Sequence, residues 1–74
     1  LGKIDGKNAG RTLLVYGHYD VQPPGDRQDW KADPFAAEIV DGQIIGRGTS
    51  DMKNNLMACV HAVKAILETE KSLP

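Results

Sequence analysis

The chain has 74 residues, and 9 Lys and Arg against 10 Asp and Glu give it a formal net charge of −1. This balance excludes the strongly basic surface that binds nucleic acid or an acidic membrane. Hydrophobic residues make up 41% and charged residues 26%, as in globular proteins and unlike disordered segments. We therefore expect one small domain at most, whose partners are selected by a local site.

Two further features of the composition limit the function classes. No uninterrupted apolar run approaches the roughly 20 residues that cross a bilayer, and no signal peptide is visible. We expect a cytoplasmic protein without a membrane partner, although the chain starts at Leu1 rather than at a methionine. Cys59 is the single cysteine, which excludes an internal disulfide and a cysteine-based zinc cluster. Its apolar helical surroundings predict a small buried hydrophobe.

The first part of the chain predicts strands and a turn. Residues 1–4 are expected to form a short edge strand, and the Gly and Asn residues within 5–10 to form turns. Residues 11–17 are expected to form a second strand. Its core at 13–16 is apolar without alternation, which is typical of parallel α/β sheets covered on both faces. One helix cannot cover both faces, so this strand predicts a larger α/β domain.

A histidine and an aspartate follow at the end of this run. Alternate residues of a strand point the same way, so His18 and Asp20 can address one site. An imidazole nitrogen binds divalent metals, and a nearby carboxylate accepts the other ring N–H and fixes the tautomer. The pair predicts a metal site at the carboxyl end of a strand. The alternative is two ordinary polar residues where a strand meets solvent.

A surface loop is predicted at residues 21–31, which contain Pro-Pro-Gly and several charges. Trp30, Pro34 and Phe35 come at its end, and we expect the aromatic rings to pack the loop back onto the sheet. For Trp30 a substrate contact is the alternative to packing.

Residues 36–46 carry the pattern of a β-hairpin. Two short β-type runs at 38–40 and 43–45 flank the dipeptide Asp41-Gly42. Asp-Gly readily takes the positive φ angles of a type I′ turn, whose twist matches antiparallel strands. We therefore expect an antiparallel pair here.

The last part of the chain predicts an amphipathic helix that ends near Pro74, with Ser50 or Asp51 as its cap. Apolar residues recur at three- and four-residue steps along one face. They are Met52, Leu56, Cys59, Val60, Val63, Ile66 and Leu67.

Asp51 stands where a glycine-rich turn enters this helix. The partial positive charge of a helix N-terminus stabilises the ionised carboxylate, which is the state that a metal needs. Asp51 is therefore a candidate metal ligand, with a plain N-cap as the alternative. The preceding Gly46-Arg47-Gly48 does not predict a phosphate-binding loop, because the third glycine of the dinucleotide fingerprint is absent and a hairpin strand precedes it.

Four blocks of sequence together resemble the M20 family of metallopeptidases and amidohydrolases, which includes dinuclear-zinc dipeptidases, aminoacylases and deacylases. The blocks are YGHYDVQP at 16–23, Trp30 with DPF at 33–35, the DG turn at 41–42, and GRGTSDMK at 46–53. The resemblance covers roughly residues 11–70 and is strongest to the dipeptidase (carnosinase-like) branch. One departure is Asn54-Asn55 where the family usually has a glycine after the lysine.

The resemblance implies a role for each matching residue. His18 would ligate one zinc ion, Asp51 would bridge two, and Asp20 would support catalysis by orienting His18. The Asp51–Met52 peptide bond is a candidate for the cis form. The implied fold class is α/β, a fragment of a zinc-exopeptidase-like (phosphorylase/hydrolase-like) domain with a strand, a β-hairpin and a C-terminal amphipathic helix. Residues 1–74 would be a partial metallopeptidase catalytic domain.

The family's general-base glutamate and its remaining ligands have no counterpart within these residues. His61 is no substitute, because it is expected at an exposed helix position.

The implied cofactor is a pair of Zn²⁺ ions, with Co²⁺ or Mn²⁺ as replacements, and the implied partner is a peptide or N-acyl amino acid substrate. The full-length protein is compatible with a homodimer. We expect the isolated chain to be inactive, and a non-catalytic binding module of the same fold is the alternative. A nucleotide-binding α/β fragment is a second, weaker alternative.

Overall fold

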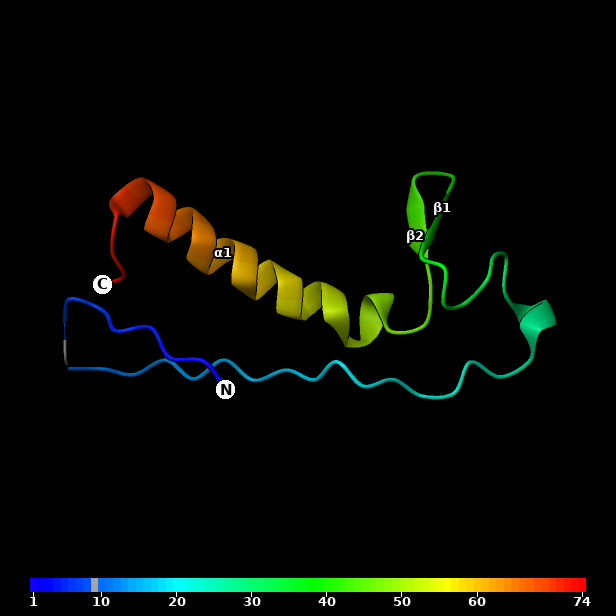
Figure 1. Cartoon of the computed structure of the whole chain (residues 1–74), viewed down its shortest axis with the longest axis horizontal. Helices are drawn as coiled ribbons and strands as arrows, with labels where there is room; N and C mark the ends of the chain where they lie inside the picture. Colours follow the sequence, from blue (N-terminus) through cyan, green and yellow to red (C-terminus); the bar gives the residue numbers. More distant parts are fainter. Residues whose placement is uncertain (9) are drawn as a thin grey trace.

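The computed structural model describes residues 1–8 and 10–74. Residues 1–8 form no helix or strand, and residues 10–26 run as a long extended segment (Figure 1). One short 3-10 turn, Arg27–Asp29, and a turn at residues 34–37 lead from this segment to the hairpin. The strands β1 (Glu38–Val40) and β2 (Gln43–Ile45) follow, then an irregular turn η2 (Thr49–Lys53) and the helix α1 (Asn54–Glu70). The extended segment lies alongside α1, and the hairpin stands at the end of α1 that is far from the C-terminus (Figure 1).

The β-hairpin is confirmed with the predicted strands and turn. Strands β1 and β2 pair antiparallel, with Ile39 opposite Ile44. Asp41 and Gly42 have φ angles of 50° and 75°. Both angles lie in the left-handed region that a type I′ turn requires, and the Asp-Gly sequence tolerates that region at low cost. The hairpin is therefore specified by local sequence.

The predicted strands at residues 1–4 and 11–17 are not present as strands. A strand requires a hydrogen-bonded neighbour, and the two strands in the described part of the chain pair with each other. Residues 11–17 are extended without a ladder, and their apolar side chains are exposed, 87% for Leu13 and 80% for Leu14. Of the predicted turns, the one at Asn8-Ala9-Gly10 includes Ala9, which lies outside the described residues.

The helix is confirmed, but it starts later than the pattern predicts and without the predicted cap. Asp51 and Met52 have non-helical angles (φ −121°, ψ 98° and φ −134°, ψ 30°), so the regular helix begins at Asn54. Lys53 occupies the N-cap position, and no side chain caps the helix. The capping role predicted for Ser50 or Asp51 is therefore wrong. Because Asp51 does not cap α1, its carboxylate is available for other contacts.

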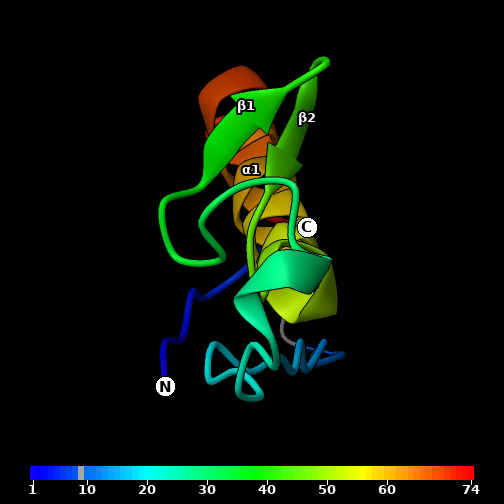
Figure 2. The same ribbon diagram turned by 90° about the vertical axis from the view of Figure 1, so that its right-hand side faces the viewer.

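One side of α1 faces the extended segment, which lies beneath the helix in both views (Figures 1 and 2). Four residues of the predicted apolar face are half-buried: Met52, Leu56, Val63 and Leu67. Cys59 is an exposed free thiol, so its predicted burial is wrong. A single extended segment covers only a narrow stripe of the helix, which leaves the edges of the apolar face uncovered. His61 is exposed, as predicted.

The molecule is long and thin, with principal extents of 51 × 23 × 12 Å. This shape leaves little interior, and Ala32 is the buried hydrophobic residue among those described, at 3% exposure. Pro34 and Gly48 are buried beside the base of the hairpin. The best-packed part of the molecule is thus the region between the end of the extended segment and the start of α1.

Candidate metal centre

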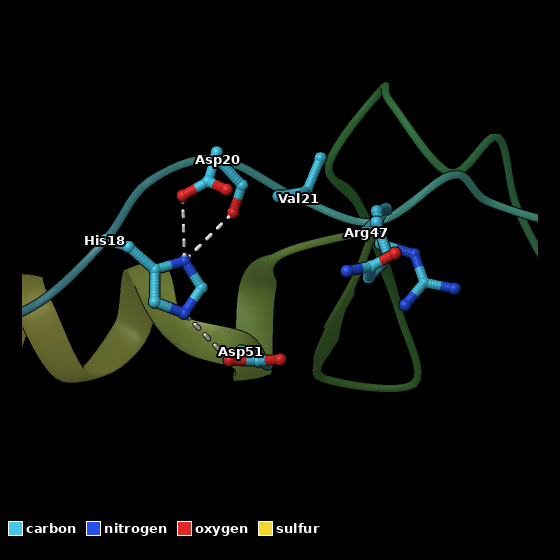
Figure 3. Close-up of a pocket in the computed structure, with 6 residues that line it drawn as sticks. His18, Asp20, Val21, Arg47 and Asp51 are labelled. Atoms are coloured by element: carbon cyan, nitrogen blue, oxygen red, sulfur yellow. Dashed lines mark hydrogen bonds and ion pairs between the residues drawn. The ribbon is translucent and has the colours of Figure 1, made fainter.

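Three polar side chains from two segments meet in this region (Figure 3). His18 and Asp20 come from the extended segment, and Asp51 comes from the turn η2 that precedes α1. The His18 Nδ1 atom lies 3.1 Å from Asp20 Oδ1, and its Nε2 atom lies 3.4 Å from Asp51 Oδ1. The imidazole ring therefore sits between two carboxylates.

Asp20 controls the side of the ring that faces away from Asp51. The extended backbone turns the Asp20 side chain toward His18, as strand-like alternation predicts. His18 Nδ1 also lies 3.1 Å from the backbone oxygen of Asp20. Both partners are acceptors, so they favour the tautomer in which Nδ1–H donates and the Nε2 lone pair faces Asp51.

The Asp51–Met52 peptide bond is cis, as the resemblance implies. The Asp51 side chain is 84% exposed, and His18 is 36% exposed. The imidazole is thus partly sheltered, whereas the carboxylate is open to solvent and to a ligand.

Two glycines allow the two segments to approach each other. Gly17 packs against Leu56 of α1 so closely that a Cβ at this position would overlap the leucine Cδ2. Gly48, with a φ of 86°, lies against Val21 in the same way. A side chain at either glycine would push the His18 segment away from the turn that carries Asp51.

Trp30 and Arg47 form a second set of contacts between the segments. The indole Nε1–H of Trp30 donates to the Pro24 oxygen at 2.8 Å, and the Arg47 guanidinium lies 5.2 Å from the ring centroid. Trp30 is half-buried, as the packing interpretation predicts. Phe35 is 66% exposed, so its predicted packing is wrong. The backbone N–H of Arg47 donates to the Pro34 oxygen at 2.8 Å and ties Pro34 to the base of the hairpin, while the next residue, Phe35, lies uncovered at the surface.

A cavity of about 180 Å³ opens beside the imidazole. It is lined by His18, Asp20, Val21, Gln22, Arg47 and Asp51. Pockets for whole drug-sized ligands measure about 300–1,000 Å³, so this cavity has room for a reacting group and a few waters. Gln22 and Arg47 were not predicted as cavity residues. Gln22 lies two residues after Asp20 and Arg47 lies four residues before Asp51, within the same motifs, and this proximity was the available signal.

The donor atoms fit part of a metal site. Two atoms bound to one tetrahedral zinc ion at about 2.0–2.1 Å lie roughly 3.4 Å apart, and His18 Nε2 and Asp51 Oδ1 are 3.4 Å apart. An imidazole nitrogen and a carboxylate oxygen are also ligand types that zinc accepts. The number of donors is incomplete, since residues 1–8 and 10–74 contain no group of three His, Cys, Asp or Glu placed to hold an ion.

Comparison with known proteins agrees with the motifs. The sequence profile described as Peptidase family M20/M25/M40 matches residues 14–74. The chain belongs to this family. M20 enzymes are generally metal-dependent, and the matched residues include all three members of the His18, Asp20 and Asp51 cluster. No solved structure matches the chain.

Two curated M20 relatives are named succinyl-diaminopimelate desuccinylase. The protein of Rhodospirillum centenum is 50% identical over 59 residues, which cover 80% of this chain and 15% of that protein. The protein of Xanthomonas campestris pv. campestris is 42% identical over 63 residues, which cover 85% of this chain and 17% of that protein. This chain thus spans less than a fifth of the length of either relative. The relatives confirm the predicted family, whereas the carnosinase-like branch stays a prediction.

The observed fold is a small α/β arrangement of one antiparallel hairpin and one C-terminal helix, and it is consistent with part of an M20 domain. No helix among the described residues is both long enough and apolar enough to cross a membrane.

Proposed function

We propose that this chain supplies the first part of the metal centre of an M20 amidohydrolase, within a longer zinc-exopeptidase-like catalytic domain. The observation that carries the proposal is the 3.4 Å separation of His18 Nε2 and Asp51 Oδ1. The exposed apolar side chains of residues 13–16 support the longer domain, because a contiguous apolar stretch of this kind is normally covered.

The substrates proposed are dipeptides or N-acyl amino acids, which share an amide bond to an amino acid. Both relatives are named for removing a succinyl group, which is an acyl group, from diaminopimelate. Their names favour an N-acyl amino acid for this chain over the dipeptides suggested by the carnosinase-like motif.

Each residue of the cluster has a distinct task in this proposal. His18 would hold the metal through its Nε2 lone pair, while Asp20 would keep the proton on Nδ1. Asp51 has two carboxylate oxygens and can face two ions at once. The ions are proposed to be Zn²⁺, with Co²⁺ or Mn²⁺ as replacements, and when bound they would polarise the amide carbonyl and lower the pKa of a water molecule. The cavity beside His18 would hold the reacting amide.

The isolated 74-residue chain is expected to show no turnover. A catalytic zinc site uses about three protein ligands, and this chain presents two donors at one point. The chain is incubated with Zn²⁺ and either N-succinyl-diaminopimelate or a panel of dipeptides. We expect amine to be released no faster than it is by Zn²⁺ alone in the same buffer. Turnover above that rate would show that the chain completes the site without further residues.

A hybrid enzyme tests the proposed function itself. In this hybrid enzyme the residues of this chain replace the aligned 59-residue stretch of the Rhodospirillum centenum protein. Metal-dependent hydrolysis of the amide in N-succinyl-diaminopimelate is the expected result, because the remaining ligands come from the relative. A folded hybrid that binds no metal would support the alternative, a non-catalytic module of the same fold.

Replacing Asp20 by alanine in the hybrid enzyme is expected to weaken zinc binding by about 10-fold, at the low end of the range for groups that orient a ligand. The effect stays small because the backbone oxygen of Asp20 also lies 3.1 Å from His18 Nδ1 and continues to favour the same tautomer. Competition with a chromophoric chelator measures the affinity. Asp26→Ala, in the nearby loop, is the control. If the two variants bound zinc with equal affinity, Asp20 would have no role in orienting His18.

A further inference from the structure

Trp30 lies between the two segments that carry the candidate ligands. Its indole N–H donates to the oxygen of Pro24 at 2.8 Å. Pro24 follows Asp20 by four residues on the same extended segment. This hydrogen bond therefore joins the indole to the segment that carries His18 and Asp20.

The face of the same indole contacts the other segment. The Arg47 guanidinium lies over the ring, 5.2 Å from its centroid, as in cation–π pairs. Arg47 precedes Asp51 by four residues. One side chain thus contacts both segments at equal sequence distances from the two aspartates.

The backbone of Trp30 is itself held in place. Its N–H donates to the Arg27 oxygen at 3.1 Å, and Arg27 Nη1 donates back to the Trp30 oxygen at 3.0 Å. These two hydrogen bonds tie the Trp30 backbone to the Arg27–Asp29 turn from which the indole projects.

We propose that Trp30 is a positioning residue that sets the spacing between His18 and Asp51. This inference rests on the proposed metal centre. Two other contacts join the same segments, Gly17 with Leu56 and Val21 with Gly48. Both are apolar and non-directional, so they bring the segments together but permit sliding. The indole hydrogen bond is directional and fixes the position along the segment.

The spacing matters because a ligand pair must be held within about 0.5 Å of its productive geometry. If the extended segment shifted at Pro24, His18 on the same segment would shift too, and the distance between His18 Nε2 and Asp51 Oδ1 would change. The indole N–H is occupied by the Pro24 oxygen, which favours positioning over the substrate contact that the sequence left open.

The test uses the full 74-residue chain with Trp30→Ala, Trp30→Phe and the control Phe35→Ala, which removes an exposed aromatic ring from the same loop. In the metal-free proteins, nuclear Overhauser contacts report whether the His18 ring protons lie near the Asp51 β-protons. A Co²⁺ titration then reports the affinity of the pair. The Gly17–Leu56 contact and the far-ultraviolet helix signal report whether each variant keeps its fold.

Trp30→Ala is expected to lose the contact between His18 and Asp51 and to bind Co²⁺ about 10-fold more weakly, with the Gly17–Leu56 contact retained. Trp30→Phe keeps the ring face but lacks the N–H, so an intermediate loss is expected. Phe35→Ala should match the wild type in both measurements.

The outcomes separate this inference from the function on which it rests. If Trp30→Ala keeps the His18–Asp51 contact, the positioning role is overturned while the metal centre stands. If Trp30→Ala also loses the Gly17–Leu56 contact and the helix signal, Trp30 has a general structural role and the inference is again overturned. If the wild-type chain binds no Co²⁺, its two donors do not hold an ion without the remaining ligands. The His18–Asp51 contact alone then decides the role of Trp30, and the hybrid enzyme alone decides the proposed function.

Discussion

Replacing His18 by alanine in the hybrid enzyme is expected to lower kcat/KM by about 1,000-fold or more, a loss of roughly 4 kcal/mol of transition-state stabilisation. The loss is large because the variant removes the nitrogen donor that lies 3.4 Å from Asp51 Oδ1. Initial rates on N-succinyl-diaminopimelate, with metal content measured on the same samples, provide the comparison.

The chain contains its own control for this experiment. His61 is the other of its 2 histidines and is exposed on α1, apart from the cluster. His61→Ala should keep both the activity and the metal content of the hybrid. If His18→Ala retained its metal and its rate, His18 would not be a ligand.

Replacing Asp51 by asparagine is expected to be at least as damaging, with a loss of about 1,000-fold in kcat/KM and of metal from the site. Asparagine has nearly the same shape, but it is neutral and one of its two oxygens becomes an NH₂ group, which cannot bind a cation. The variant therefore tests the charge and the second oxygen rather than the packing of η2.

The exposure of Asp51 makes this a clean comparison, since an 84% exposed side chain can be replaced with little effect on folding. Asp41→Asn in the hairpin turn is a matched control, because asparagine also accepts the positive φ angle of 50° at that position. A hybrid with Asp51→Asn that keeps full activity and two equivalents of metal would eliminate the bridging role.

The parts of this fold that depend on residues close together in the sequence could be predicted from the sequence. Asp41-Gly42 specifies its own turn and hence the register of β1 and β2. The spacing of apolar residues such as Leu56 and Val63 specifies a helix, whichever elements lie beside it. The shared direction of His18 and Asp20 follows from an extended backbone alone.

The parts that depend on distant residues could not be predicted in this way. Residues 11–17 have strand composition, but pairing requires a neighbour that composition cannot supply. Cys59 lies on the apolar face, yet its burial depends on how much of that face is covered. The Trp30–Arg47 contact joins residues from different elements, and no local pattern predicts such a pair.

The approach of His18 to Asp51 belongs to this second kind. The residues considered singly left both open as ordinary polar groups, and the resemblance to the M20 family was the reason to expect them at one site. The structure brings their side chains within 3.4 Å of each other.

The central claim, that His18 and Asp51 share a metal ion, is tested most directly by anomalous scattering at the zinc edge from crystals of the zinc-loaded hybrid enzyme. We expect an anomalous peak at about 2.0–2.2 Å from both His18 Nε2 and an Asp51 carboxylate oxygen. A zinc ion bound through other residues, with these two side chains contacting only each other, would contradict the claim.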